Sequence, residues 1–138
     1  EDPGTYRIAV RHRNHLGCMT ANGFILSGTA TSVDLTSSGT STYGTNARRT
    51  VGAVRTLWSG NVIPDAELKY TGGTNDRDPI LQAIGGSAPT NVVLGNYAAS
   101  DVNMDGRIKY VGQDNDRDPI LTNVGGSIPT NTILEQLP

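Results

Sequence analysis

The feature of this sequence that most constrains its fold is an internal repeat with a period of 40 residues. When residues 61–98 are aligned with residues 101–138 without a gap, 19 of the 38 positions are identical. The longest shared stretch runs from Asn75 to Leu81 and again from Asn115 to Leu121. A repeat of this length is one supersecondary unit, so both copies should contain the same few elements. We therefore predict two structurally equivalent units in tandem.

Each unit is predicted to contain a short strand, an acidic loop and a short helix. In the second unit, residues 107–111 favour a strand, and the helix begins at Asp118-Pro119. Aspartate can cap free backbone N–H groups, and proline suits the first helical turn. Gly125-Gly126 ends the helix, as glycine does at C-terminal caps, and residues 127–137 run extended. The first unit repeats this pattern, with Asp78 as the capping residue.

The first 57 residues have a different pattern. Apolar and polar side chains alternate over residues 6–11, which is the period of a half-buried strand. Further strands are predicted at 23–27 and 32–36, and residues 49–57 favour a strand or a helix. Three or four strands make only part of an immunoglobulin-like sandwich, which has about seven. Such an incomplete sheet leaves an unpaired edge unless strands come from elsewhere.

The predicted fold is therefore mainly β with short helices, in the α+β class. We expect a partial, immunoglobulin-like β-sandwich over residues 1–57. The first calcium-loop repeat, which is degenerate, and its linker follow over residues 58–100. The second repeat covers residues 101–138.

Residues 101–106, which read DVNMDG, are typical of the opening of a calcium-binding loop. Calcium prefers six to eight oxygen ligands, and oxygen-bearing side chains at alternate positions converge when the backbone curls. The predicted ligands are therefore Asp101, Asn103 and Asp105, together with the backbone carbonyl of Arg107.

A standard loop of this kind closes with an acidic residue at its twelfth position, which is Gly112 here. We therefore predict a loop about four residues longer, closed by a bidentate Asp116. Either Asp114 or Asn115 would be an additional ligand. The alternative is that these Asp, Asn and Gly residues only mark turns.

The loop of the first unit has lost part of this pattern. Ile63 stands where an oxygen ligand is expected, Ala66 replaces the glycine, and Asn61 replaces the opening aspartate. We predict either a second metal site or a metal-free relic. The candidate ligands in the first loop are Asp65, Glu67, Asn75 and Asp76.

Composition narrows the class of function. The net charge of −2 gives no basic excess, which argues against a nucleic-acid partner. No apolar run reaches the roughly 20 residues needed to cross a bilayer. The single cysteine, Cys18, excludes an internal disulfide and is expected to be buried.

No catalytic constellation is evident, so we do not expect an enzyme. His12 and His15 have no nearby Cys or Glu to complete a transition-metal site, which favours a structural role at a strand end. The chain starts at Glu1 without a methionine, which suggests a piece of a longer precursor.

The tandem loop-and-helix units over residues 61–138 resemble dockerin modules of secreted bacterial proteins, which consist of two copies of a D-x-N-x-D-G calcium loop followed by a helix. Only the second unit keeps that loop pattern in full. A closer resemblance is to the C-terminal region of large secreted multidomain proteins of the Bacteroidota. It covers YRIAVRHRNH at 6–15, MTAN at 19–22, YGTN at 43–46 and the paired NDRDPIL blocks. This resemblance implies an extracellular or cell-surface location. It also implies that residues 3–10 form a late strand of a β-sandwich whose earlier strands lie upstream.

The leading hypothesis is an extracellular structural or adhesive module stabilised by calcium. Neighbouring subunits would complete each other's sheets by strand addition, giving a fibre or surface assembly. The expected partners are other copies of the chain or neighbouring domains of the same precursor, with glycans on the Ser/Thr-rich residues 27–45. The alternatives are a dockerin-like protein-binding module and a carbohydrate-binding module, for which Trp58 and scattered tyrosines are the sequence support.

Overall fold

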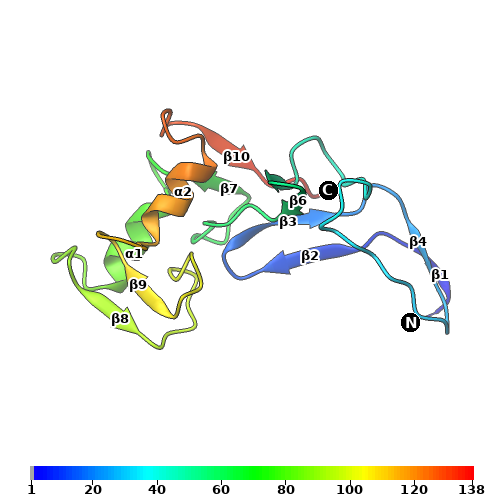
Figure 1. Ribbon diagram of the computed structural model, residues 1–138, viewed down its shortest axis with the longest axis horizontal. Coiled ribbons are helices and arrows are strands. Elements are labelled where there is room, and N and C mark those ends of the chain that lie inside the picture. Colours follow the sequence, from blue (N-terminus) through cyan, green and yellow to red (C-terminus); the bar gives the residue numbers. More distant parts are fainter. Residues whose placement is uncertain (1) are drawn as a thin grey trace. The chain divides into compact units, whose positions relative to one another are not determined.

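Residues 2–138, which the computed structural model describes, form ten short β-strands and two short α-helices (Figure 1). The predicted class, mainly β with short helices, is confirmed. The chain divides into two compact units. The first contains residues up to 11, residues 17–58 and residues 135–138. The second contains residues 12–16 and 59–134.

Six strands belong to the N-terminal part of the chain. They are β1 (Gly4–Tyr6), β2 (Ala9–His12), β3 (His15–Met19), β4 (Phe24–Leu26), β5 (Arg49–Val51) and β6 (Val54–Thr56). Strand β1 pairs with β4, β2 with β3, and β5 with β6. The predicted strand at 23–27 corresponds to β4, and residues 49–57 form a hairpin whose turn contains Gly52 at φ +58°.

Two expectations for this region are wrong. The alternating stretch 6–11 is divided between β1 and β2. Residues 32–36 form no strand in the structure. There, Asp34 Oδ1 accepts hydrogen bonds from the backbone N–H and the hydroxyl of Thr36, at 2.8 and 2.7 Å. Such local bonding by an aspartate side chain competes with sheet pairing and fixes a turn.

Every sheet in residues 2–138 has two strands, so each strand has a single sheet neighbour. The first unit also has few buried apolar side chains. Those that the structure describes there are Cys18, Met19 and Ala47, and the buried Cys18 agrees with the sequence prediction. By contrast Ile25, in the middle of β4, is 72% exposed.

In the second unit, every element of the first repeat has a counterpart 40 residues later. The first repeat contains β7 (Glu67–Lys69), α1 (Arg77–Ala83) and β8 (Val92–Leu94). The second contains β9 (Arg107–Lys109), α2 (Arg117–Asn123) and β10 (Thr132–Leu134). The helices end as predicted, because the N–H groups of Gly86 and Gly126 donate to the carbonyls of Leu81 and Leu121, both at 2.8 Å.

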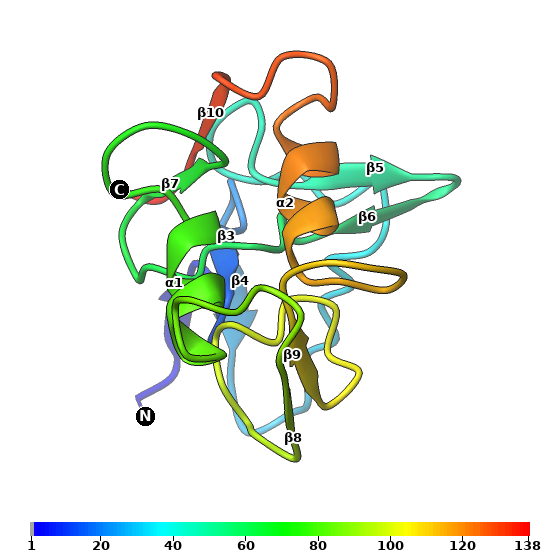
Figure 2. The ribbon, with the colours of Figure 1, turned by 90° about the vertical axis from the view of Figure 1, so that its left-hand side faces the viewer.

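The strands of the two repeats pair crosswise. Strand β7 pairs antiparallel with β10, and β8 pairs antiparallel with β9 (Figures 1 and 2). The central pairs, Leu68 with Ile133 and Val93 with Ile108, are related by the same 40-residue shift. Each repeat therefore supplies the sheet partner of the other, and the two copies form one interlocked unit with pseudo-twofold symmetry.

The core of this unit is built from equivalent positions of the two repeats. The buried pairs are Val62 with Val102, Leu68 with Ile108, Ile80 with Ile120, and Ile84 with Val124. Gly60 lies against this core at φ +108°, where an added Cβ would be 2.7 Å from Ile120 Cγ1. Only glycine fits both that conformation and that contact.

Candidate metal-binding loops

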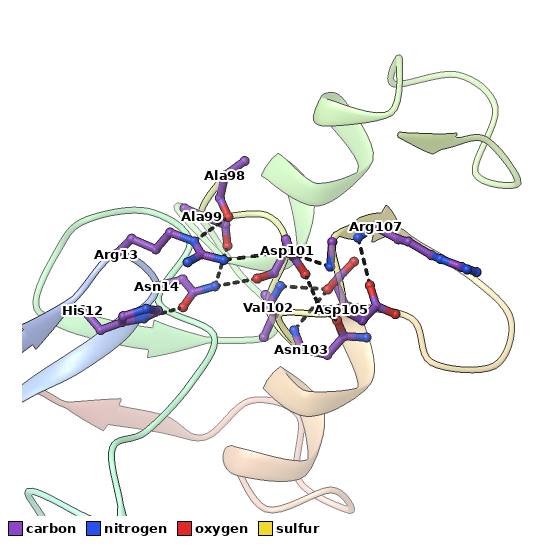
Figure 3. Close-up of polar contacts among 12 residues, drawn as sticks. His12, Arg13, Asn14, Ala98, Ala99, Asp101, Val102, Asn103, Asp105 and Arg107 are labelled. Carbon is purple, nitrogen blue, oxygen red and sulfur yellow. Dashed lines mark hydrogen bonds and ion pairs between the residues drawn. The ribbon is translucent and has the colours of Figure 1, made fainter. Parts of the chain in front are cut away.

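The opening of the second loop is curled around its own side-chain oxygens (Figure 3). The backbone N–H of Asp105 donates to both Asp101 Oδ1 and Asn103 Oδ1, at 3.1 and 3.0 Å. Asp101 Oδ2 accepts from Gly106 N–H at 3.2 Å. Because one N–H group is shared, the Asp101 and Asn103 oxygens lie on the same side of the loop.

Backbone conformation maintains the curl. Gly106 lies at φ +80°, and Met104 also occupies the left-handed region at φ +61°. A residue other than glycine there costs on the order of 1–3 kcal/mol, so the contacts of the loop must offset that strain. Asp105 Oδ1 accepts from Arg107 N–H at 2.9 Å, which leads the chain into β9.

Asp116, the predicted closing ligand, is fully buried and accepts three backbone hydrogen bonds. Its Oδ1 accepts from Val102 and Asn103 N–H at 2.7 and 3.2 Å, and its Oδ2 accepts from Lys109 N–H at 2.8 Å. Burial raises the pKa of this carboxyl, and the backbone donors partly oppose that shift. With about four lone-pair positions on a carboxylate, these bonds leave about one for a metal ion. Asp116 therefore joins the start of the loop to β9.

Asp76 makes the same three bonds in the first repeat. Its Oδ1 accepts from Val62 and Ile63 N–H at 2.8 and 3.0 Å, and its Oδ2 from Lys69 N–H at 2.8 Å. Burial raises the pKa of Asp76 to about 6, despite the opposing backbone donors. The first loop lacks part of the ligand pattern, yet this anchoring carboxylate is unchanged. The anchor is thus independent of the ligand pattern.

Asn75 and Asn115 supply the side-chain caps of the two helices, so the predicted capping by Asp78 and Asp118 is wrong. Asn75 Oδ1 and Asn115 Oδ1 accept from the N–H groups of those aspartates, both at 3.0 Å. The asparagine Nδ2 atoms donate to the aspartate carboxylates at 2.9 and 2.8 Å. The residues that directly precede the helices make no side-chain cap bond. Asp78 and Asp118 instead form ion pairs with the arginines that precede them, Arg77 and Arg117.

The remaining predicted ligands are placed differently in the two loops. Asp114 is exposed, and its backbone carbonyl accepts from Asn103 Nδ2 at 2.9 Å. Asp65 Oδ1 accepts from Glu67 N–H at 3.0 Å, which matches the bond of Asp105. The Glu67 carboxylate forms an ion pair with the Lys69 ammonium group. Glu67 is therefore engaged within its own strand.

Asn61 stands where the second loop has Asp101, and the sequence pattern marks it as a lost ligand. Its Nδ2 donates to the carbonyl of Asp65 at 3.0 Å. Its Oδ1 is buried and has no hydrogen-bond partner among the described residues. A buried acceptor left alone costs about 1–3 kcal/mol. The signal that points to Asn61 is its position, 40 residues before Asp101.

Residues of the β2–β3 turn hold the start of the second loop (Figure 3). Asn14 Nδ2 donates to the backbone carbonyl of Asp101 at 2.7 Å. The Arg13 guanidinium lies 3.6 Å from Asp101 Oδ2 and 3.9 Å from the ring centre of Tyr97. A shallow hollow of about 340 Å³ beside Asp101 exposes the loop to solvent, and Arg13, Tyr97 and Met104 contribute to its lining. No local sequence signal identifies Arg13 or Asn14, because they precede the loop by almost 90 residues.

The same turn carries the two histidines of the chain. His12 Nδ1 and His15 Nδ1 lie 2.8 Å apart. Burial, together with the positive charges of His12 and Arg13, lowers the pKa of His15 to about 4. The His15 imidazole is therefore neutral at neutral pH.

Two kinds of feature are absent from residues 2–138. No three His, Cys, Asp or Glu side chains form a group that could hold a metal ion. No helix is long and apolar enough to cross a bilayer. Among known proteins, no family model, curated protein or solved structure matches this chain.

Proposed function

We propose that this chain is an extracellular structural or adhesive module stabilised by calcium. The observation that carries the proposal is the curl of the loop over residues 101–106, where the backbone N–H of Asp105 donates to side-chain oxygens of both Asp101 and Asn103. Oxygen atoms in this arrangement suit a hard cation. Near-millimolar extracellular calcium would fill even a site with a dissociation constant of ~10⁻⁴–10⁻³ M.

The electrostatics of the loop support a divalent ion. The Asp101 side chain is 4% exposed, and the cation nearest to its carboxylate is Arg13 at 3.6 Å. A buried carboxylate is costly unless it is paired or bound to a metal. Calcium held by Asp101, Asn103 and Asp105 and by the carbonyl of Arg107 would, together with Arg13, balance the negative charge of the two carboxylates. Water would complete the shell.

We further propose that the interlocked repeats are a dockerin-like pair and that the first unit is part of a β-sandwich. The second statement is supported by the two-stranded sheets and by the few buried apolar side chains of the first unit. Strands from a second copy, or from a neighbouring domain of the same precursor, would pair along β1 or β4 and cover Ile25. Together with the resemblance to surface proteins of the Bacteroidota, this favours a cell-surface assembly.

A dockerin-like docking module is the second candidate. It is favoured by the pseudo-twofold arrangement, which presents two equivalent loop-and-helix frames to a partner. The carbohydrate-binding alternative has less support. Two aromatic side chains that could bind a sugar are already engaged within the chain. Arg13 lies over the ring of Tyr97, and the indole N–H of Trp58 donates to the carbonyl of Asn46 at 2.8 Å.

Calorimetric calcium titration tests the metal part of the proposal. We expect the wild-type chain to bind calcium and the Asp105→Ala variant to lose that heat. Asp65→Ala is the matched control, since Asp65 occupies the same position of the first loop and makes the same backbone bond. Absence of heat in the wild type, or an equal loss in both variants, would contradict a site centred on residues 101–107.

Sedimentation velocity separates the two functional candidates. A self-assembling module should form large species without any partner, in a concentration-dependent manner. A docking module should remain monomeric at all concentrations. Replacing Ile25 with Lys on β4 should reduce assembly if strand addition occurs there. Leu94→Lys on β8 is the matched control, because Leu94 is 70% exposed and Ile25 is 72% exposed.

A further inference from the structure

The turn between β2 and β3 brings three polar atoms into mutual contact. His12 Nδ1 and Asn14 Oδ1 are 3.0 Å apart, His15 Nδ1 and Asn14 Oδ1 are 2.8 Å apart, and the two Nδ1 atoms are 2.8 Å apart. The imidazole rings meet almost at right angles, with an interplanar angle of 82°. The three atoms thus form a nearly equilateral triangle at the tip of the turn.

The orientation of the Asn14 amide is set by its other bonds (Figure 3). The side chain is fully buried, and Nδ2 donates to the backbone carbonyls of Asp101 and Ala99, at 2.7 and 3.2 Å. Those acceptors require the NH₂ group, so Oδ1 is the atom that faces the imidazoles. The triangle therefore contains one oxygen, which only accepts, and two imidazole nitrogens.

No protonation state gives a hydrogen bond along all three edges of this triangle. If only one Nδ1 atom carries a proton, the lone pair of the other faces the lone pair of Asn14 Oδ1. If both Nδ1 atoms carry protons, those protons face each other across 2.8 Å. If neither does, all three atoms present lone pairs to one another. One positive ion bound to all three lone pairs removes the conflict.

We propose that His12 Nδ1, His15 Nδ1 and Asn14 Oδ1 bind a divalent transition-metal ion. An ion placed at about 2.05 Å from each atom lies at a usual metal–imidazole distance. Because the three donor atoms are 2.8–3.0 Å apart, the donor–metal–donor angles would be about 90°. Right angles suit the octahedral or tetragonal coordination of Ni²⁺ and Cu²⁺. Tetrahedral zinc would need edges of about 3.3 Å at the same distance.

The surroundings of the triangle are compatible with a bound cation. The neighbouring Arg13 side chain is engaged elsewhere, with Nε donating to the carbonyl of Ala98 at 3.0 Å and the guanidinium beside Asp101 and Tyr97. Both histidines are partly exposed, so the remaining coordination positions are within reach of solvent. Asn14 supplies the third donor that the sequence pattern did not reveal, because an amide is not a typical transition-metal ligand.

Calorimetric titration with Ni²⁺ tests the proposal on the whole chain at neutral pH, with calcium in excess so that harder oxygen sites are filled. We expect one equivalent of Ni²⁺ to bind to the wild type. The His12→Gln/His15→Gln double variant should bind at least about tenfold more weakly, and it contains no other histidine. Asp105→Ala is the control and should bind Ni²⁺ like the wild type. Absence of binding to the wild type, or undiminished binding to the double variant, would overturn the proposal.

If the double variant does not fold, a measurement on the wild type alone still tests the proposed metal site. Electron paramagnetic resonance of the Cu²⁺-loaded protein at one equivalent should show hyperfine coupling to two equivalent imidazole nitrogens. A spectrum typical of oxygen ligands alone, or of a single nitrogen, would overturn the three-donor site. Neither experiment depends on whether calcium binds to residues 101–107.

Discussion

The two acidic loops of the second unit share a frame and differ in the side chains placed on it. In both, a buried aspartate accepts three backbone N–H bonds and an asparagine caps the helix. Only the second loop has Asp101, Asn103 and Gly106, where the first has Asn61, Ile63 and Ala66. The fold of the loop and its proposed metal chemistry thus depend on different residues. Each can therefore change without the other.

Removing the anchoring carboxylates should produce the largest effect. Asp76→Ala and Asp116→Ala should each lower the free energy of unfolding by about 3 kcal/mol, because each leaves three backbone N–H groups without their acceptor. Urea unfolding followed by circular dichroism, once with a chelator and once with calcium, measures the loss. Asp118→Ala, which removes a more exposed carboxylate of the same repeat, is the control. A loss confined to Asp116 and to calcium-containing buffer would mean that Asp116 acts as a ligand rather than as an anchor.

Removing calcium should have a smaller effect. A site with a dissociation constant of ~10⁻⁴ M contributes about 1.4 kcal/mol to the free energy of unfolding at ~1 mM calcium. We expect a chelator to destabilise the wild type and Asp65→Ala by this amount and to leave Asp105→Ala unaffected. Thermal unfolding with and without chelator measures it. Equal responses of the two variants would show that the loops do not differ in calcium binding.

The helix caps should matter equally in the two repeats. Asn75→Ala and Asn115→Ala each remove a cap, which costs about 1 kcal/mol, and the loss should be insensitive to calcium. Denaturant unfolding of the two variants provides the comparison. If Asn115→Ala is the more damaging variant only when calcium is present, Asn115 has a role in the metal site that Asn75 lacks.

Acidification should act in opposite directions through Asp76, which is buried, and His15, which is partly buried. The pKa of Asp76 is raised to about 6 by burial, so its contribution to stability is present at low pH and is lost as the pH rises through about 6. The pKa of His15 is lowered to about 4 by burial and by His12 and Arg13, so stability is lost as the pH falls from about 6.5.

These opposed contributions can be separated by mutation. Between pH 4 and 6, Asp76→Asn should make the unfolding free energy fall more steeply on acidification, and His15→Gln should make it fall less steeply or rise. The slope against pH, rather than the absolute stability, is the quantity to compare in unfolding titrations. Parallel slopes in the wild type and both variants would contradict the shifted pKa values.

The sequence predicts the elements of the repeats well but not how they combine. A 40-residue period requires equivalent strands and helices, and Gly125-Gly126 marks a helix end by local conformational preference alone. The crosswise pairing of the strands cannot be predicted from the sequence. Because the two copies have nearly the same strand pattern, pairing within a repeat and pairing between repeats are equally compatible with it. Register can be inferred only after the partner is known.

The errors in the site and in the first unit have similar physical causes. Asn115 and Asp118 are both good capping residues, and the backbone conformation alone decides which one precedes the first turn. Arg13 and Asn14 reach the second loop through tertiary structure, which no local pattern encodes. At Asp34, a local side-chain bond outweighs the strand propensity of its neighbours.

The crosswise pairing has a consequence for the order of synthesis and folding. Leu68 in β7 finds its sheet partner, Ile133, only near the carboxyl end of the chain. A nascent chain leaving the ribosome therefore cannot close the core around the first helix until almost all of these residues have been translated. Contacts so distant in sequence form slowly, because a long loop must close before they contribute. The first repeat therefore needs β10 of the second repeat in order to fold. Deleting residues 132–134 should prevent both repeats from folding.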